Sequence, residues 1–332
     1  MGTVVIIGGG TAGAPAARSL KKGLGPEHRV VLIEKEEMLA NLAVLPLYAV
    51  GKKNKGQFLR RRSLLGRQGV ELIAGEVLQI DPDRKRVCTG REEIAYDLLL
   101  VAAGVELDRN RPPGMAEAGL DLQSLEGVEK LRQALPHFPG GDIAIVVASK
   151  NIKCPGAPYE YALLLEDWFY RRGRSRDVSI TVYTPEKAPL LLFGEKASGA
   201  MAGLLLNRNI RLHPQAQVRR IDPAGKEIFL EKESFPYDLL LYYAAAAPPP
   251  FIRESKLGGE EGWLKVDRHT MALEEAEDIF AIGDVAGVAT PSGEALPKMG
   301  AVAHLQSLVA AGNMARLMKG EKPRRAYSGF AA

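Results

Sequence analysis

The sequence predicts an α/β fold in which two dinucleotide-binding-type domains follow one another, a tandem Rossmann-like arrangement. Three observations support this. An apolar strand leads into a glycine-rich turn and an alanine-rich helix, a second strand ends in an acid, and a strand motif recurs later in the chain. A chain of 332 residues is also long enough for two domains that each have a core.

The first predicted element is a strand at residues 3–7 that runs directly into a glycine turn. Gly8, Gly10 and Gly13 fit the pattern G-x-G-x-x-G, and a helix is expected from about Ala14. In this pattern the first glycine allows a tight turn, the second lets the backbone approach a pyrophosphate, and the third lets the helix pack on the strand. The N–H groups at the start of the helix would bind the phosphates.

The second predicted strand, residues 29–34, ends in an acid. Glu34 follows Gly13 by about 20 residues, which is where an acid binds the hydroxyls of an adenosine ribose in such folds. A glycine turn alone could be structural. Because strand, turn, helix, strand and acid occur in the required order, we predict a dinucleotide site.

Shorter elements are predicted next. A basic, helix-like stretch ends near Arg67, residues 70–77 and 85–89 are expected as short strands, and Asp81 begins a turn between them. Residues 96–104 form an apolar segment typical of a buried parallel strand.

An internal repeat relates the two halves of the chain. Residues 80–82 (Ile-Asp-Pro) and 96–100 (Tyr-Asp-Leu-Leu-Leu) reappear at 221–223 and 237–241, and both motifs are displaced by the same 141 residues. This predicts two copies of one βαβ-like unit.

The second copy differs from the first at its turn. Its first strand is expected at 143–147, but residues 149–154 (Ser-Lys-Asn-Ile-Lys-Cys) and two prolines stand where the first copy has glycines. Side chains and prolines obstruct a close approach of the backbone to a pyrophosphate. Its second strand, 178–185, ends without an acid for a ribose, so we predict that the phosphate cradle is lost and that NADH is not the direct reductant.

The last predicted elements are a strand ending in Gly283-Asp284 and a helix from Pro297 to Met318. Proline is expected in the first turn of this helix, and its predicted apolar face comprises Val302, Leu305, Leu308, Val309 and Met314.

We divide the chain into a discontinuous first domain, residues 1–112 and 246–332, and a second domain, residues 113–245, enclosed by the first. The first is predicted to bind FAD, and the second is a nicotinamide-type domain without its cradle.

Composition excludes several functions. The net charge is only +4, and the basic runs at 60–62 and 171–176 are each expected at the end of a helix, facing water, so no nucleic-acid partner is predicted. The five histidines have no metal-ligand spacing, so no metal is predicted. Two cysteines, Cys88 and Cys154, form no disulfide framework, and Cys88 carries no predicted role.

Location can also be predicted. The N-terminus enters a core strand at once, which leaves no room for a signal peptide, and no apolar run approaches the ~20 residues needed to span a bilayer. The protein is expected to be cytoplasmic or peripheral to the cytoplasmic membrane.

The glycine turn with Glu34, the strand end at Ala103-Gly104 and Gly283-Asp284 together resemble the flavoprotein disulfide reductase superfamily, the FAD-dependent pyridine nucleotide-disulfide oxidoreductases. The resemblance implies that Asp284 binds a ribityl hydroxyl of FAD, that backbone at Val77 meets the adenine, and that FAD is bound non-covalently, since no cysteine lies near Asn41. The implied FAD-binding residues are Gly8, Gly10, Thr11, Ala12, Gly13, Glu34, Lys35, Val77, Ala103, Gly104, Gly283, Asp284 and Lys298.

Within that superfamily, residues 153–160 (Lys-Cys-Pro-Gly-Ala-Pro-Tyr-Glu), 184–186 and Pro297-Lys298 resemble the sulfide:quinone oxidoreductases and the flavin subunit of flavocytochrome c sulfide dehydrogenase. The resemblance implies that Cys154 takes up sulfur from sulfide and that Lys298 lies beside the flavin and a quinone. It implies sulfide and quinone as substrates and allows peripheral contact with a membrane.

Physical reasoning agrees with these roles. Lys150, Lys153 and a helix N-terminus would lower the pKa of the Cys154 thiol and so favour the nucleophilic thiolate. A helix starting at Pro297 would stabilise negative charge on a reduced flavin. The quinone is expected near Lys298 and the apolar residues 248–251.

The sequence also departs from this family. The second cysteine of the family follows a segment resembling residues 327–332, where this chain stops, so the C-terminal quinone and membrane portion is expected to be missing. A third family cysteine is absent near residues 122–125. Two alternatives therefore stay open: a type II NADH dehydrogenase or ferredoxin-type reductase, and a catalytically incomplete FAD-binding protein. The acceptor, the sulfur product and whether the chain forms a homo-oligomer are also open.

Overall fold

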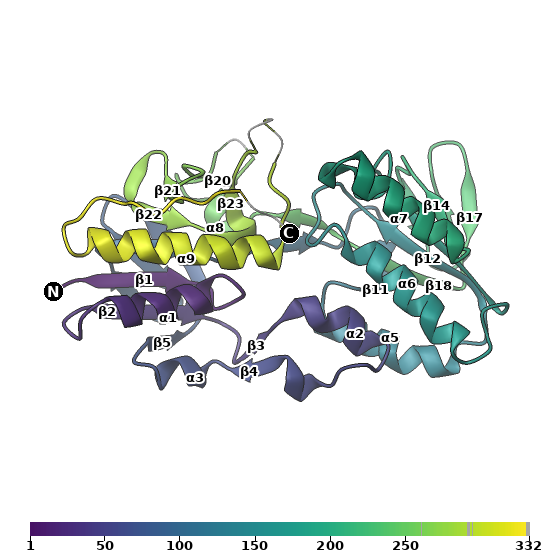
Figure 1. Ribbon diagram of the computed structural model, residues 1–332, viewed down its shortest axis with the longest axis horizontal. Coiled ribbons are helices and arrows are strands. Elements are labelled where there is room, and N and C mark those ends of the chain that lie inside the picture. Colours follow the sequence, from purple (N-terminus) through teal and green to yellow (C-terminus); the bar gives the residue numbers. More distant parts are fainter. Residues whose placement is uncertain (260, 291–292, 294, 330–332) are drawn as a thin grey trace. The chain divides into compact units, whose positions relative to one another are not determined.

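The computed structural model describes residues 1–259, 261–290, 293 and 295–329. The chain forms two compact units, and Figure 1 shows their helices and strands. One unit comprises Met1–Asn41, Leu59–Glu106 and Ala247–Ala332, and the other comprises Leu42–Phe58 and Leu107–Ala246. Residues 42–58 thus group with the second unit, whereas the sequence division placed them in the first domain.

The first unit is built on a six-stranded sheet in the order β21-β22-β9-β1-β2-β5, parallel except for the pairing of β21 with β22. Its strands are β1 (Thr3–Ile7), β2 (Arg29–Glu34), β5 (Glu71–Ala74), β9 (Leu98–Val101), β21 (Ala272–Leu273) and β22 (Ala276–Ala281). The strands β1, β2 and β9 are almost completely buried because both faces of the sheet are covered.

Two helices pack on one face of this sheet. They are α1 (Gly13–Gly23) and α9 (Gly300–Leu317), which lie side by side in Figure 1. Ala16, Ala17 and Leu20 of α1 share a core with Val302 and Met314 of α9. The small residues of α1 allow this close packing.

A three-stranded antiparallel sheet packs on the opposite face through its apolar side chains. It consists of β6 (Val77–Asp81), β7 (Arg86–Thr89) and β8 (Glu93–Ala95). The single strand predicted at 70–77 is wrong, because the chain bends at residues 75–76 and β5 and β6 join different sheets. The turn predicted at Asp81 is confirmed.

The basic stretch before β5 is mostly not helical. It contains β4 (Leu59–Arg61), which pairs with β3 (Met38–Ala40), and only a four-residue helix, α3 (Ser63–Gly66). The prediction that residues 60–62 end a helix is therefore wrong, whereas residues 171–176 do follow a helix. Pairing with β3, which is remote in sequence, overrides the helical propensity of the arginines.

The last helix begins later than predicted. Met299 is its N-cap, with extended dihedral angles, so Pro297 precedes the helix instead of lying in its first turn. The N–H of Leu296 donates to the carbonyl of Val288, which holds this segment extended. The predicted apolar face is also wrong at Leu308, which is 38% exposed, because it lies two residues from the buried Gln306.

Four short elements complete the first unit and the connections between the units. They are α8 (Pro250–Arg253), the pair β20 (Leu264–Lys265) and β23 (Ala286–Gly287), and a 3₁₀ turn, η5 (Gly283–Val285). The strands β10 (Glu106–Asp108) and β19 (Ala245–Ala247) lie where the chain passes from one unit to the other.

The second unit has a fully parallel five-stranded sheet in the order β11-β18-β12-β13-β14. Its strands are β11 (Gly119–Asp121), β12 (Gly141–Val147), β13 (Val178–Tyr183), β14 (Arg211–His213) and β18 (Leu239–Tyr243). Its helices are α2 (Leu45–Ala49), α4 (Met115–Ala118), α5 (Leu125–Ala134), α6 (Ala157–Tyr170) and α7 (Glu195–Asn207).

The predicted repeat is confirmed by a second antiparallel sheet. It consists of β15 (Arg220–Asp222), β16 (Glu227–Phe229) and β17 (Ser234–Pro236), the counterparts of β6, β7 and β8. The displacement that relates Tyr96 to Tyr237 also maps the bounds of β8 onto those of β17. Both units therefore carry the same α/β plan, and the predicted fold class is confirmed.

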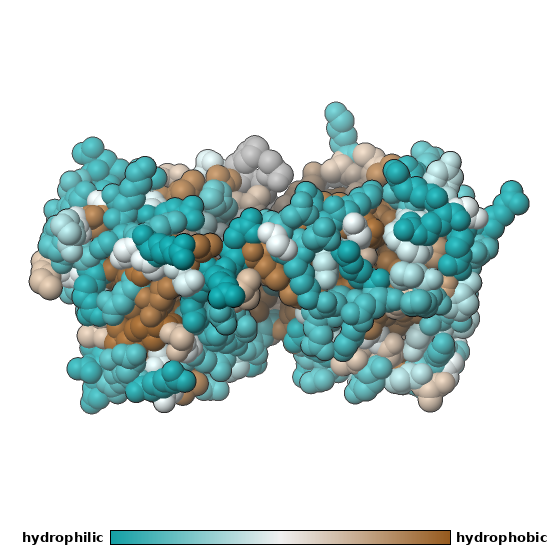
Figure 2. All heavy atoms as spheres, turned by 90° about the horizontal axis from the view of Figure 1, so that it is seen from below, coloured by the Kyte–Doolittle hydropathy of each residue, from teal (hydrophilic) through white to brown (hydrophobic). Residues whose placement is uncertain are grey.

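The molecular surface has the mixed character that composition predicts. Figure 2 shows a face that is mainly hydrophilic, with hydrophobic residues between the polar ones. Among the described residues, no helix has both the length and the apolar composition needed to cross a bilayer. Of the predicted C-terminal segment 327–332, residues 330–332 lie outside the described residues.

Candidate active site

The glycine turn between β1 and α1 is shaped by backbone contacts. Gly8 has φ +92°, and a β-carbon there would lie 2.5 Å from the carbonyl oxygen of Ala102. A β-carbon on Gly13 would lie 1.8 Å from the carbonyl oxygen of Gly8. The fold itself therefore requires glycine at both positions.

Gly10 is different, because no atom lies within 4 Å of a β-carbon built there and its φ is ordinary. Packing within the protein does not explain this glycine. The open space in front of the turn is what a pyrophosphate would occupy. The turn thus fits a bound dinucleotide, and the sequence argument for Gly10 gains a structural basis.

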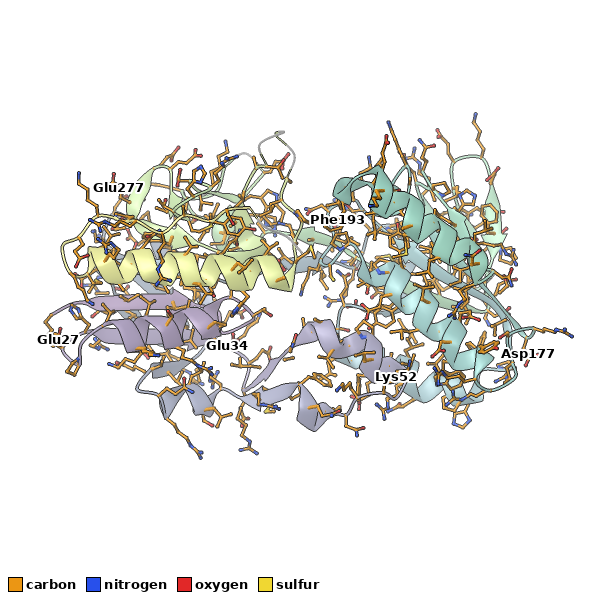
Figure 3. The ribbon with its side chains drawn as sticks, viewed as in Figure 1. Glu27, Glu34, Lys52, Asp177, Phe193 and Glu277 are labelled. Carbon is orange, nitrogen blue, oxygen red and sulfur yellow. The ribbon has the colours of Figure 1, made fainter. Side chains whose placement is uncertain are left out.

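Glu34 is held against the turn at the end of β2. Its carboxylate accepts hydrogen bonds from the N–H of Gly9 at 2.6 Å and from the N–H of Glu36 at 2.8 Å. Figure 3 labels Glu34 at the edge of the sheet where α1 begins. The acid is therefore at the carboxyl edge of the parallel strands, where ligands bind in open α/β sheets.

A cavity of about 410 Å³ in the first unit opens beside Glu34. The predicted residues Gly8, Glu34, Lys35, Val77 and Ala103 all line it. Lys35 forms an ion pair with Glu76 at 2.8 Å. The structure thus brings together residues from four separate segments that the sequence assigned to one site.

The same cavity is also lined by residues that the sequence assigned elsewhere. Pro249, Pro250 and Phe251 line it, whereas Lys298 lines a different, smaller cavity. The expectation that a quinone binds near Lys298 and residues 248–251 stays a prediction. Only the tertiary structure shows which cavity this proline-rich segment lines.

The Gly283-Asp284 turn lies next to the start of α1. A β-carbon on Gly283 would lie 3.4 Å from the β-carbon of Ala12, and one on Gly300 would lie 3.5 Å from a methyl of Thr11. The predicted residues Thr11, Ala12, Gly283 and Asp284 are thus neighbours. Gly104 follows β9 with φ +67°, and nothing lies within 4 Å of its β-carbon position.

Gln306 is a site residue that sequence reasoning missed. Its side chain on α9 is 1% exposed and accepts a hydrogen bond at 2.7 Å from the N–H of Gly283. A glutamine among the apolar residues of a buried helix face was the available signal. It fixes the turn that carries Asp284.

Replacing Gln306 with leucine is expected to raise the Kd for FAD about 10- to 100-fold. The substitution leaves the partly buried N–H of Gly283 without its side-chain partner, a loss of about 1–3 kcal/mol, and loosens the turn. Equilibrium titration of the FAD-free protein would measure this. Ser307→Ala is the matched control, because the hydroxyl of this buried neighbour donates within the helix, to the carbonyl of His304. Equal effects of both variants would contradict the assignment.

Lys298 lies just before α9 and is half-buried. Its ammonium group donates to the backbone carbonyl of Asp284 at 2.6 Å and lies 3.6 Å from the ring centre of Trp263. Burial lowers the pKa of Lys298 to about 8, and the negative charge of Asp284 opposes that shift. The site therefore contains a cation that is poorly solvated near neutral pH.

Replacing Lys298 with methionine is expected to stabilise the FAD-free protein at pH 7 by about 1–2 kcal/mol, after allowance for partial exposure. The pKa of Lys298 is about 8 in the folded protein, against an ordinary value of 10.5 that applies to the unfolded chain. Below pH 8 the charged lysine therefore destabilises the folded state. That penalty disappears between pH 8 and 10.5. Chemical denaturation of both proteins across this range would measure it, and a difference independent of pH would contradict the prediction.

Cys154 lies in the second unit, in the loop that replaces the glycine turn. Its φ of 54° is left-handed, a conformation strained for a non-glycine residue, and its carbonyl accepts a hydrogen bond from the N–H of Ala157 at 2.9 Å. The N-cap of α6 is Gly156, which has no side chain to accept hydrogen bonds from the first N–H groups of the helix. Cys154 is thus a half-buried residue just before Gly156, the N-cap at the positive end of a 14-residue helix.

Two buried tyrosines lie close enough to Cys154 to interact with it electrostatically. Tyr161 and Tyr243 have ring centres 6.2 Å apart, and the hydroxyl of Tyr161 donates to the carbonyl of Leu122 at 3.2 Å. Burial raises the pKa of both tyrosines, and the nearby acids Glu160 and Asp121 act in the same direction. Both tyrosines therefore remain neutral near neutral pH.

The second unit has no acid at the end of β13. Thr184 follows β13, as Glu34 ends β2, and it is fully buried. The next acid, Glu186, accepts a hydrogen bond from the hydroxyl of Tyr159, and burial raises the pKa of Glu186. An acid occupied in this way is a poor ligand for ribose hydroxyls.

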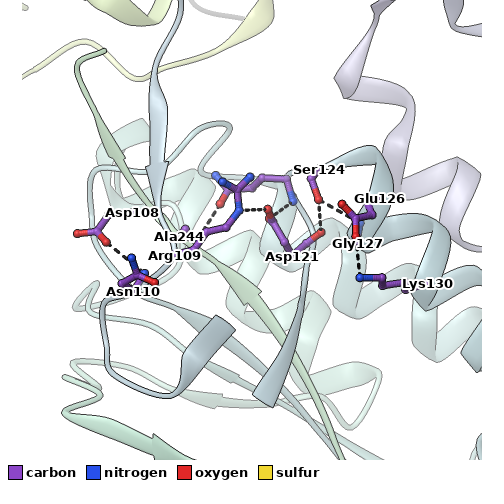
Figure 4. A network of polar contacts seen from close by, with 10 residues as sticks. Asp108, Arg109, Asn110, Asp121, Ser124, Glu126, Gly127, Lys130 and Ala244 are labelled. Carbon is purple, nitrogen blue, oxygen red and sulfur yellow. Dashed lines mark hydrogen bonds and ion pairs between the residues drawn. The ribbon is translucent and has the colours of Figure 1, made fainter. Parts of the chain in front are cut away.

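A polar network anchors the neighbouring end of β11, as Figure 4 shows. Asp121 accepts hydrogen bonds from the guanidinium of Arg109 at 2.9 Å and from the N–H of Gln123 at 2.8 Å. The side-chain oxygen of Gln123 in turn accepts from the N–H of Ala244 at 2.6 Å. This network fixes the strand ends next to Leu122, to which Tyr161 is bonded.

The remaining cysteine and the acidic and histidine residues suggest no further centre. Cys88 lies in β7, and burial raises the pKa of its thiol, which disfavours the reactive thiolate. Within the described ranges, no three His, Cys, Asp or Glu side chains are grouped as a metal site.

Comparisons with known proteins show the family of the chain. The family model described as pyridine nucleotide-disulphide oxidoreductase matches residues 2–315. The mitochondrial sulfide:quinone oxidoreductase of Mus musculus is 25% identical over 341 residues, covering 98% of this chain and 74% of that protein. A type II NADH:quinone oxidoreductase of Staphylococcus aureus is 23% identical over 335 residues, covering 96% and 83%. The crystal structure of the sulfide:quinone oxidoreductase from Aquifex aeolicus has a TM-score of 0.87 at 23% identity, covering 96% of this chain and 78% of that one.

One α/β unit has a glycine turn with open space at Gly10, and the second unit has the same plan. This combination is typical of an FAD-dependent oxidoreductase. The chain belongs to the pyridine nucleotide-disulphide oxidoreductase family, since the family model covers nearly its whole length, and it is similar to sulfide:quinone oxidoreductases.

Proposed function

We propose that this protein oxidises sulfide, or a related reduced sulfur compound, through Cys154 and non-covalently bound FAD, with a quinone as electron acceptor. The observation that carries the proposal is the loop of the second unit. A strained cysteine at a helix N-terminus stands where a nicotinamide-binding unit has its glycine turn.

In this proposal the first unit would bind FAD and the second unit would bind the sulfur. In the first unit, the open turn at Gly10 would accept the pyrophosphate, Glu34 the adenosine ribose and Asp284 the ribityl chain, while FAD supplies two-electron transfer. Val77 and Ala103 would line the adenosine side of the cavity. Lys298 would lie by the flavin and the quinone.

In the second unit, Cys154 would bind the sulfur. When a Cys154 thiolate and hydrosulfide form a sulfur–sulfur bond, one proton and two electrons are released. Bound FAD would supply the two-electron acceptor that this step requires, and a quinone with two protons would be the final acceptor, giving a quinol. The positive end of α6, with Lys150 and Lys153 nearby in the sequence, would favour the thiolate.

Two features weigh against NADH as the electron donor. The second unit has no glycine turn, and Glu186 is already bonded to Tyr159. The relative from Staphylococcus aureus nevertheless makes NADH the necessary comparison.

An anaerobic titration of the FAD-loaded protein tests the proposal. Sulfide and NADH are added to separate samples while the absorbance of oxidised flavin is followed. Bleaching by sulfide alone is expected. Bleaching by NADH alone would favour a type II NADH dehydrogenase or ferredoxin-type reductase, and flavin that responds to neither would favour a catalytically incomplete FAD-binding protein.

A further inference from the structure

The ring of Trp263 contacts the ammonium group of Lys298. No sequence motif includes this tryptophan. The tryptophan immediately precedes β20, and its carbonyl accepts a hydrogen bond from the N–H of Gly259 at 3.1 Å. β20 pairs with β23, the strand that directly follows the turn bearing Asp284. The ring and the Asp284 carbonyl are thus carried by adjoining segments of the first unit.

The ammonium group of Lys298 has two close partners of different kinds. The carbonyl oxygen of Asp284 accepts a hydrogen bond at 2.6 Å, and the ring centre of Trp263 lies 3.6 Å from the nitrogen. Of the aromatic side chains, tryptophan attracts a cation most strongly, and the attraction grows when the cation is desolvated. Both partners favour the charged lysine, against the burial that disfavours it.

We propose that Trp263 is a positioning residue for Lys298: its ring face and the Asp284 carbonyl together hold the ammonium group charged and oriented in the site. The carboxylate of Asp284 is the charged group that adds to this effect. A cation held in this way favours an anionic group brought into the site. The inference deepens the proposed function, on which it rests for the role of Lys298.

A purely structural role for Trp263 is the competing explanation. The tryptophan packs closely on β23, since a β-carbon on Gly287 would lie 3.1 Å from the β-carbon of Trp263. A structural role would affect folding and flavin content but not the protonation of one lysine. The test must therefore measure Lys298 itself.

Trace acetylation of the FAD-loaded protein across a range of pH, followed by digestion and mass spectrometry, measures the apparent pKa of Lys298. In Trp263→Leu the apparent pKa is expected to fall by about one unit, because the ring no longer stabilises the charged form. In Trp263→Phe the fall is expected to be smaller, because phenylalanine keeps a weaker ring. The other lysines in the same digest are the internal reference.

Trp168→Phe is the matched control. Trp168 is the other tryptophan of the chain, and its ring also contacts a cation, since its centre lies 3.8 Å from the guanidinium carbon of Arg172 in the second unit. It is expected to leave the Lys298 profile unchanged. If Trp263→Leu loses its flavin or misfolds, the apparent pKa of Lys298 is measured in Trp263→Phe with full flavin content instead. An unchanged or raised apparent pKa of Lys298 in the flavin-loaded Trp263 variants would overturn the proposal. Because acetylation needs neither sulfide nor quinone, it tests the role of Trp263 separately from sulfide oxidation.

Discussion

Replacing Cys154 with serine is expected to slow the reduction of bound flavin by sulfide at least about 1000-fold, because a serine hydroxyl is not ionised near neutral pH and cannot form the sulfur–sulfur bond. Flavin content should not change, since Cys154 lies in the second unit and the glycine turn lies in the first. Anaerobic stopped-flow measurement of flavin bleaching gives the rate.

The chain contains its own control for this experiment. Cys88, the other cysteine, lies in β7 of the first unit, and burial raises the pKa of its thiol. Cys88→Ser is therefore expected to be reduced by sulfide at the wild-type rate. If Cys154→Ser were reduced as fast as Cys88→Ser, Cys154 would have no part in the reaction.

Replacing Gly10 with alanine is expected to raise the Kd for FAD at least about 100-fold while the FAD-free protein stays as stable as the wild type, within about 1 kcal/mol. The free protein has room for the added methyl group, whereas a pyrophosphate approaching the turn would collide with it. FAD titration and denaturant unfolding of the FAD-free protein measure the two quantities.

Substitutions at two other glycines are the controls for this experiment. Gly13→Ala is expected to destabilise the protein itself, since its β-carbon would lie 1.8 Å from the carbonyl oxygen of Gly8. Gly56→Ala, which also has no atom within 4 Å of the added carbon, is expected to alter neither quantity. Wild-type FAD affinity in Gly10→Ala would show that the turn does not bind the phosphates.

Stability and function are expected to conflict at Lys298. A half-buried ammonium group with a pKa near 8 is unfavourable for the FAD-free protein at pH 7, and methionine would relieve this. Such a residue is typical of a functional site, where a poorly solvated charge gains from an oppositely charged ligand.

The amino-acid sequence by itself determined the features that depend on neighbouring residues. The apolar runs of β1 and β9, the glycine turn and Glu34 were all recognisable, because strand burial and tight turns leave local patterns. The repeat could be detected because both units preserve the same hairpin sheet and the strand after it.

Only the tertiary structure decided which distant residues meet. Gln306 reaches Gly283, and Trp263 reaches Lys298, across separations that leave no periodic signal in the sequence. The start of α9 was mispredicted for the same reason, since a hydrogen bond to Val288 keeps the preceding segment extended. Local propensity describes a segment by itself, whereas the partners of a buried polar group are set by how the whole chain packs.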